Sequence, residues 1–287
     1  MTEPVRRPPI INEIKTHEFA VIQVPRSRWR KLWDSGTFRK TLLLAVLVLL
    51  WELYARALGN PLLFPTFTAT VGALFKSIAS GEIPRAAVTT LALLFKGYTA
   101  GLVLAGLLTA VASMTRLGAD ILETLTAMFN PLPSIALLPL ALLWFGLGEG
   151  SIIFVLIHAV LWAAALNTYT GFRSVSPTLT LVGRNYALSR AGFVLHILIP
   201  GAFPSILAGM KIGWAFAWRT LIAAELVFGV SSGKGGLGWY IYQSKNQLEI
   251  PEVFAGLLTV ILFGLFVENL VFRVIEKRTV RRWGMAH

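Results

Sequence analysis

Six long apolar stretches constrain this chain more than any other feature of its sequence. A helix that crosses the hydrocarbon core of a bilayer needs roughly 20 mostly apolar residues. Stretches that meet this requirement lie at residues 40–58, 88–114, 121–147, 151–169, 206–230 and 253–272. Three prolines, Pro131, Pro133 and Pro139, interrupt the third stretch, and neighbouring helices or a polar cavity must satisfy the carbonyls they free. The sequence therefore predicts an all-α, polytopic membrane protein with six transmembrane helices.

The composition supports lipid as the solvent of this chain. It is 55% hydrophobic and 14% charged, whereas a soluble domain carries about 25% charged residues. The net charge of +12 is concentrated at the two ends and avoids the apolar middle, so it fits membrane topology better than nucleic-acid binding. We therefore expect membrane lipid as a partner, and no nucleic acid. The absence of cysteine excludes disulfides and cysteine-based metal sites.

The distribution of lysine and arginine predicts the orientation. Nine of these residues lie within 1–40 and five within 273–282. The loops predicted on the same side add Arg116, Arg173, Arg184 and Arg190, while the opposite side has only Lys76, Arg85, Lys234 and Lys245. Basic residues favour the cytoplasmic side. We expect both termini in the cytoplasm, a location in the bacterial inner membrane and no cleavable signal peptide.

Three regions follow from this pattern. Residues 1–40 are a basic lead in which 26–40 resembles an interfacial helix, with a disordered basic tail as the alternative. Residues 41–275 are the transmembrane domain, and 276–287 are a basic cytoplasmic tail. A short amphipathic segment at 69–80 is expected on the outer surface.

The longest cytoplasmic loop, residues 173–204, contains a helix signature. Ser176 can cap a helix whose first residue is Pro177. Leu179, Val182 and Tyr186 then form an apolar stripe at helical spacing, and we expect the helix to end at Gly192. Such a helix either rests on the base of its own protein or docks into a groove of a partner.

This loop and several other motifs resemble the permeases of binding-protein-dependent importers, in the branch for sulfonate, taurine, nitrate and bicarbonate. The family's loop pattern of Glu-Ala-Ala, glycine and a terminal aliphatic-x-aliphatic-Pro aligns on Pro200, which follows Ile197-Leu-Ile. Ala187 then stands where the family has glycine, and Leu181 stands where it has glutamate. The likeness extends over Asn130-Pro-Leu-Pro-Ser, Trp144-Phe-Gly-Leu-Gly-Glu, Asn167 with Gly171, Ala223-Ala-Glu and Gly235-Gly-Leu-Gly.

The resemblance implies a type I permease fold and a homodimer that works with two ATPase subunits and an extracytoplasmic binding protein. ATP and Mg²⁺ would bind to the ATPase, so we expect no cofactor and no catalytic role for this chain. The expected substrate is a small anion: a sulfonate, taurine, nitrate, bicarbonate or an aromatic carboxylate. The residues expected to couple to the ATPase are Val182, Arg184, Tyr186, Ala187, Leu188, Ser189 and Arg190. The alternative is a stand-alone channel or secondary transporter.

Charged residues inside the apolar stretches indicate where polar surroundings are needed. Arg219 lies near the middle of its stretch and must face a cavity or a carboxylate. Glu225 projects about 120° away from it on the same helix, so an ion pair with Glu52 or Glu268 is the alternative. Residues expected along the translocation path are Asn130, Ser134, Asn167, Arg219 and Glu225.

Several other patterns have structural interpretations. Gly233-Lys-Gly-Gly-Leu-Gly fits the letters of a dinucleotide motif, but no strand precedes it, and we interpret it as a flexible turn. The isolated His158 and His196 are expected to be structural. Gly97-x₃-Gly101 and Gly209-x₃-Gly213 permit close helix packing, either within one subunit or at a subunit interface.

Overall fold

The computed structural model describes residues 33–228, 235–280 and 282. All regular elements in these ranges are helical, which confirms the predicted all-α class. The contacts divide the chain into two units, one ending at Leu50 and one beginning at Trp51. Of the expected interfacial helix at 26–40, residues 26–32 lie outside the described ranges, whereas 33–34 are helical and 36–40 begin a longer helix. Half of the predicted C-terminal tail 276–287, namely 281 and 283–287, also lies outside them.

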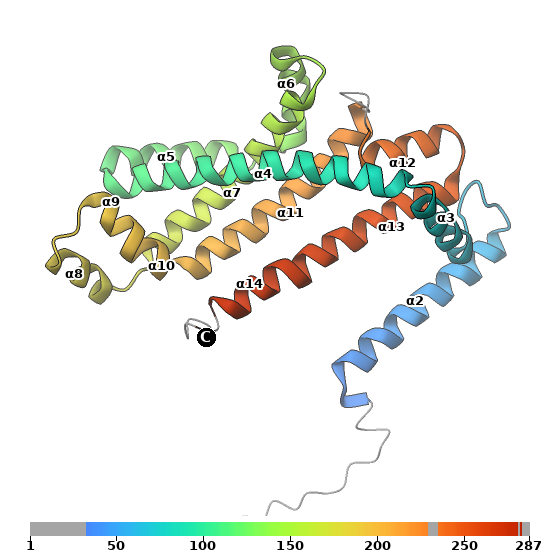
Figure 1. The fold of residues 1–287 in the computed structure, drawn as a ribbon, viewed down its shortest axis with the longest axis horizontal. Helices are drawn as coiled ribbons and strands as arrows, with labels where there is room; N and C mark the ends of the chain where they lie inside the picture. Colours follow the sequence, from blue (N-terminus) through green and yellow to red (C-terminus); the bar gives the residue numbers. More distant parts are fainter. Residues whose placement is uncertain (1–32, 229–234, 281, 283–287) are drawn as a thin grey trace, which may run out of the picture. The chain divides into compact units, whose positions relative to one another are not determined.

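The helices follow one another with short connections (Figure 1). In chain order they are α2 Gly36–Leu58, α3 Phe67–Ala79, α4 Glu82–Met114, α5 Arg116–Phe129, η1 Ser134–Leu137, α6 Leu138–Phe145, α7 Glu149–Arg173, α8 Pro177–Asn185, α9 Arg190–Phe193, η2 Val194–Leu198, α10 Ile199–Gly201, α11 Phe203–Phe228, α12 Leu237–Asn246, α13 Ile250–Phe266, η3 Val267–Phe272 and α14 Arg273–Arg278. The predicted amphipathic segment 69–80 corresponds to α3, whose first turn is capped by the Thr66 side chain.

Among the described residues, four helices are individually long and apolar enough to cross a membrane, and the number reaches six if each of two bent pairs is one span. The first pair, Arg116–Phe129 with Ser134–Phe145, bends by 90°, so the apolar stretch 121–147 is not one continuous helix. Pro131 and Pro133 lie in the break, where they remove backbone donors and exclude a helical continuation. The second pair, Arg190–Gly201 with Phe203–Val227, bends by 77°. The six-span prediction therefore holds if each bent pair is one span.

Close glycine contacts join α4, α7 and α11, which run side by side (Figure 1). A Cβ atom on Gly97 of α4 would lie 2.5 Å from Leu156 Cβ, and one on Gly101 would lie 2.7 Å from Val160 Cβ, both on α7. Gly209 of α11 approaches α7 just as closely, because its Cβ would lie 2.8 Å from Asn167 Cβ. Both glycine motifs thus pack within one chain, as the intrachain interpretation predicted.

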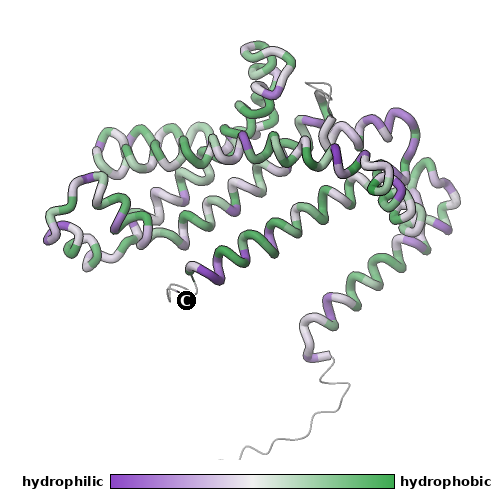
Figure 2. Tube along the Cα trace, viewed as in Figure 1, coloured by the Kyte–Doolittle hydropathy of each residue, from purple (hydrophilic) through white to green (hydrophobic). Residues whose placement is uncertain are grey.

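Hydrophobic residues continue along α13, and hydrophilic residues gather at the α14 end (Figure 2). The hydrophilic end includes Arg273, Lys277 and Arg278. Glu276 of α14 accepts a 2.7 Å hydrogen bond from the Lys211 ammonium group of α11. This contact joins the C-terminal helix to the start of the preceding span.

Candidate functional site

Helix α8 forms the predicted part of the loop at residues 173–204. The Ser176 hydroxyl accepts a 3.4 Å hydrogen bond from the Leu179 N–H, and Pro177 occupies the first turn. Both features were expected from the sequence, because a capping oxygen satisfies a free backbone donor and proline needs none at this position.

The expected end of this helix at Gly192 is wrong. Helix α8 ends at Asn185, and Ala187 turns the chain with a left-handed φ of 49°. The N–H groups of Ala187 and Leu188 bond back to the carbonyls of Arg184 and Gly183 at 2.9 and 3.3 Å. Gly192 instead lies inside α9, whose first turn is capped by Ser189. A turn that needs positive φ explains why the related loops have glycine where this chain has Ala187.

The apolar stripe of α8 is not covered by the chain itself. Gly183 is buried against Phe193 and Ile197, so α8 contacts the following helices through this residue. Leu179, Val182 and Tyr186 are exposed, and the Tyr186 side chain is 78% accessible. All seven residues expected to couple to an ATPase are exposed as well.

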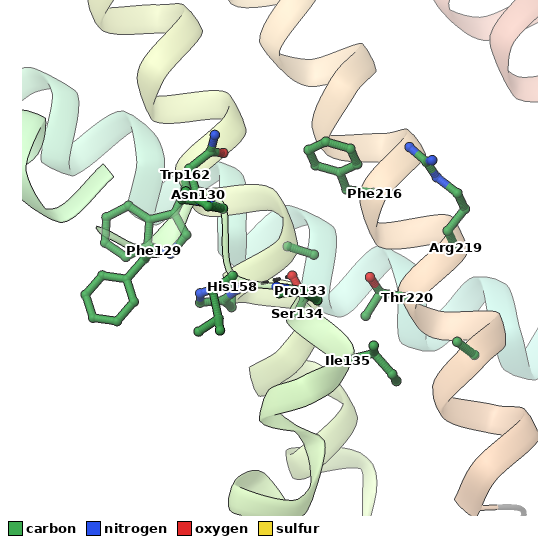
Figure 3. A pocket seen from close by; sticks show the side chains of 14 residues that line it. Phe129, Asn130, Pro133, Ser134, Ile135, His158, Trp162, Phe216, Arg219 and Thr220 are labelled. Atoms are coloured by element: carbon green, nitrogen blue, oxygen red, sulfur yellow. Dashed lines mark hydrogen bonds between the residues drawn. The ribbon is translucent and has the colours of Figure 1, made fainter. Parts of the chain in front are cut away.

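A cavity of about 320 Å³ lies between the end of α5, η1, α7 and α11 (Figure 3). Its lining contains three of the five residues expected along the translocation path, and these three are Asn130, Ser134 and Arg219. The break at Pro131 and Pro133 shapes one side of it, since both prolines and the turn between α5 and η1 belong to the lining. The cavity therefore lies beside the prolines of the irregular third span, where neighbouring helices or a polar cavity were expected to satisfy the freed carbonyls.

Arg219 brings the cavity its positive charge. Its Nε–H donates a 3.0 Å hydrogen bond to the Ala215 carbonyl, and its guanidinium lies 5.3 Å from the centre of the Phe216 ring. Among the described residues it makes no ion pair, so the alternative pairing with Glu52 or Glu268 is wrong. Glu52 binds Arg56 at 2.7 Å and also accepts hydrogen bonds from Thr68.

The opposite side of the cavity is aromatic (Figure 3). Phe129 of α5 stacks on Trp162 of α7, with ring centres 5.3 Å apart and planes at 18°. His158 meets Phe129 edge-on, and its Nδ1 shares a 3.1 Å hydrogen bond with the Ser134 hydroxyl. His158 Nε2 and Trp162 Nε1 are buried and lack a hydrogen-bond partner in the described part of the chain.

Two of the expected path residues lie outside this cavity. The Asn167 side chain donates a 2.8 Å hydrogen bond to the Ala163 carbonyl of its own helix. The same residue packs closely against Gly209 of α11. Glu225 is 2% exposed and accepts hydrogen bonds from the Thr90 hydroxyl at 2.9 Å and from the Gly238 N–H at 2.9 Å. Neither side chain reaches the cavity, because each is held by its own packing.

The glycines after α11 form more than the expected flexible turn. Residues 233 and 234 of the motif lie outside the described ranges. A Cβ atom on Gly236 would collide with the Glu225 carboxylate, and one on Gly238 would lie 2.6 Å from Glu225 Cβ. These two positions are therefore packed tightly against a buried carboxylate, at the start of α12.

Two of the remaining intramembrane charges have partners in this structure. The Lys96 ammonium group lies 2.6 Å from the Glu149 carboxylate, and Lys211 pairs with Glu276 as described above. Within the described ranges no three His, Cys, Asp or Glu side chains gather as a metal site would require.

Sequence reasoning missed the aromatic side of the cavity. It treated His158 as an isolated structural residue, and it gave Phe129, Trp162, Phe216 and Thr220 no role. One available signal was the spacing of His158 and Trp162, since residues four apart share one face of a helix. The contribution of Phe129 had no such signal, because it comes from a different helix.

Comparison with known proteins identifies the class of this chain. Residues 97–282 match the family model of the binding-protein-dependent transport system inner membrane component. A protein of Bacillus subtilis strain 168 with the provisional name of aliphatic sulfonates transport permease is 28% identical, over 93% of this chain and 94% of its own length. The nitrate import permease protein of Synechocystis is 26% identical, over 84% of this chain and 88% of the relative. The taurine transport system permease protein of Escherichia coli K12 is 32% identical, over 55% of this chain and 56% of its own length. This chain therefore belongs to the family of inner membrane components of binding-protein-dependent transport systems.

Proposed function

We propose that this chain is the permease subunit of an ATP-driven importer, and that it moves a small anion across the inner membrane by alternating access. The family supports the importer class, and the names of three relatives give sulfonate, taurine and nitrate as the substrates of those proteins. The chain works as a homodimer with two ATPase subunits and an extracytoplasmic binding protein. ATP and Mg²⁺ bind to the ATPase, and both termini of the permease face the cytoplasm.

The uncovered stripe on α8 carries this proposal. An isolated helix of nine residues has little stability of its own, and its apolar side gains free energy only when a partner covers it. Val182 and Tyr186 supply apolar contact area, and Arg184 and Arg190 supply positive charge beside it. The turn at Ala187, Leu188 and Ser189 fixes the angle at which α8 leaves the body of the permease. ATP-driven movement of the ATPase is transmitted to the membrane helices through this segment.

The choice of an anion rests on Arg219. An arginine stays charged at every physiological pH, and in a membrane span its charge must be compensated by water, a carboxylate or a ligand. Among the described residues, no carboxylate lines the cavity that contains Arg219. Asn130, Ser134 and Arg219 contact the passing anion, while Asn167 and Glu225 hold the helices around the path.

Substitution of Tyr186 tests the dock. In Tyr186→Asp a charge replaces an aromatic ring that is 78% accessible, so we expect folding and insertion to be preserved. We expect copurification of the ATPase to fall at least tenfold, and stimulated ATP hydrolysis to fall with it. Tyr186→Phe keeps the ring and is the matched control, which should retain both properties. Normal ATPase capture by Tyr186→Asp would show that the dock lies elsewhere.

A further inference from the structure

The cavity beside Arg219 is more apolar than a binding site for a small inorganic anion needs to be. Of its 14 lining residues, nine are apolar: Phe129, Pro131, Leu132, Pro133, Ile135, Ala159, Trp162, Phe216 and Ala223. One lining residue, Arg219, carries a full charge, and the remaining four are Asn130, Ser134, His158 and Thr220. A volume of about 320 Å³ lies at the lower end of the range found for small-molecule sites. The cavity therefore matches a ligand with one anionic group and a larger apolar body.

The positive group is positioned for such a ligand. The Nε–H of Arg219 donates to the Ala215 carbonyl, and its guanidinium lies 5.3 Å from the centre of the Phe216 ring, so two contacts hold this side chain beside the cavity. The terminal amino groups of the fork make no hydrogen bond to any residue in the described ranges. Two parallel N–H donors of this kind suit a carboxylate or a sulfonate.

The apolar body has a matching surface across the cavity (Figure 3). The stacked pair Phe129–Trp162 and the edge-on ring of His158 form a continuous aromatic wall. Trp162 is 8% exposed, and its Nε1 is a buried donor without a partner among the described residues. Aromatic groups gain free energy from offset or edge-on contact with other rings, beyond the gain from burial alone.

We propose that this cavity is a binding station for an organic monoanion with an aromatic or other flat apolar body. Its charged group binds Arg219, and its body lies against Phe129 and Trp162. A nitrate or bicarbonate ion would lose part of its hydration beside the aromatic wall without an apolar group to place there. The permease would then contribute to substrate selection itself, in addition to the binding protein. This inference rests on the anion path proposed above and specifies its substrate class.

Equilibrium binding to the full chain tests the station. The purified chain in phosphatidylcholine nanodiscs is titrated with radiolabelled benzenesulfonate and methanesulfonate, and nitrate is added as a competitor. We expect benzenesulfonate to bind at least tenfold more tightly than methanesulfonate, and nitrate to compete weakly. These titrations use the wild-type chain, so they test the proposal even if a substitution in the aromatic wall impairs folding. Equal affinities for benzenesulfonate and methanesulfonate, or nitrate competing as well as benzenesulfonate, would overturn it.

Two substitutions then test the contact to the anionic group and the contact to the apolar body of the ligand separately. Phe129→Leu should weaken benzenesulfonate binding about fivefold and change methanesulfonate binding less than twofold, because only the aryl ring contacts the wall. Arg219→Gln should weaken the binding of both probes at least tenfold. Phe95→Leu, at a 71% exposed position of α4 outside the cavity, is the matched control and should change neither. An equal loss of both probes in Phe129→Leu would contradict the aromatic contact.

Failure of the binding station can be distinguished from failure of the proposed importer function. Binding is measured on the permease without its ATPase, whereas the importer assignment is judged by ATPase capture on the wild-type chain. If no ATPase associates but benzenesulfonate binds as expected, the station stands and the importer mechanism falls. If the ATPase associates and the probes bind equally, only the station falls.

Discussion

The packed centre of the molecule and the loop at residues 173–204 differ in how far their apolar side chains are buried. In the centre, α4, α7 and α11 meet through glycines, and the side chains of Leu156 and Val160 fill the space that those glycines leave. In the loop, Phe193 and Ile197 pack against Gly183 of α8, but the apolar stripe of α8, including Tyr186, is exposed.

The two regions differ in polar groups too. The central carboxylate of Glu225 is satisfied within the chain by Thr90 and Gly238. In the loop, the hydroxyls of Ser176 and Ser189 cap short helices, and Arg173 at its start pairs with Glu123 of α5 at 3.1 Å. The buried carboxylate of the centre is therefore satisfied within one chain, whereas the apolar stripe of the loop stays exposed.

The largest expected effect comes from filling a glycine contact in the centre. In Gly101→Val, the new Cβ would lie 2.7 Å from Val160 Cβ, so α4 and α7 must separate. We expect a loss of about 3 kcal/mol or more in the free energy of unfolding, because a close-packed contact cannot absorb extra methyl groups. Thermal unfolding in detergent followed by size-exclusion chromatography measures this effect.

The same helix supplies the control for this prediction. A Cβ atom on Gly106 would meet nothing within 4 Å, so Gly106→Val should change the melting temperature little. Equal behaviour of the two variants would mean that the glycines do not set the helix contact, and the comparison between centre and loop would lose its basis.

A smaller effect is expected from the hydrogen bonds around the buried carboxylate. Thr90→Val removes the hydroxyl that donates to Glu225 and accepts from the Leu237 N–H at 2.8 Å. One buried donor and part of a carboxylate lose their partner, which costs about 1–3 kcal/mol. Thr89→Val is the control, since the Thr89 hydroxyl bonds only to the Arg85 carbonyl of its own helix. Chemical denaturation of both variants in mixed micelles measures the difference, and equal midpoints would contradict it.

The smallest effect is expected in the loop and has the opposite sign. Ala187 adopts a φ of 49°, which costs roughly 1 kcal/mol for a residue with a Cβ atom and almost nothing for glycine. Ala187→Gly should therefore slow amide hydrogen exchange across 184–189 by about fivefold, without changing global stability. Ala191→Gly, at an exposed helical position of α9, should accelerate exchange nearby instead. Faster exchange in Ala187→Gly would show that the turn is not strained.

Much of the fold could be predicted from the sequence because it depends on local chemistry. Apolar length predicted the spans, Pro131 and Pro133 predicted an irregular third span, and Ser176 with Pro177 predicted the start of α8. The end of α8 was predicted wrongly, since glycine is the usual terminator and Ala187 adopts the required φ without being one.

The candidate site was only partly predictable. Helix geometry correctly argued against a direct pair between Arg219 and Glu225, because both lie on one helix and their relative direction follows from their spacing. The alternative partners Glu52 and Glu268 were wrong, since their suitability depended on how separate helices are rotated. The actual partners of Glu225, Thr90 and Gly238, are 135 and 13 residues away along the chain.

Apolar length was enough to predict that this chain crosses the membrane as a set of helices, and Ser176 with Pro177 was enough to predict the capped start of α8. Hydrophobic length and helix capping depend on residues that are close together in the sequence, so both can be predicted from it. The tertiary structure was needed to show that Arg219, Phe129, His158 and Trp162 line one cavity, and that Asn167 and Glu225 lie outside it. The rotation of each helix about its axis and the bend at residues 130–133 set these distances, and both result from packing between helices far apart in sequence.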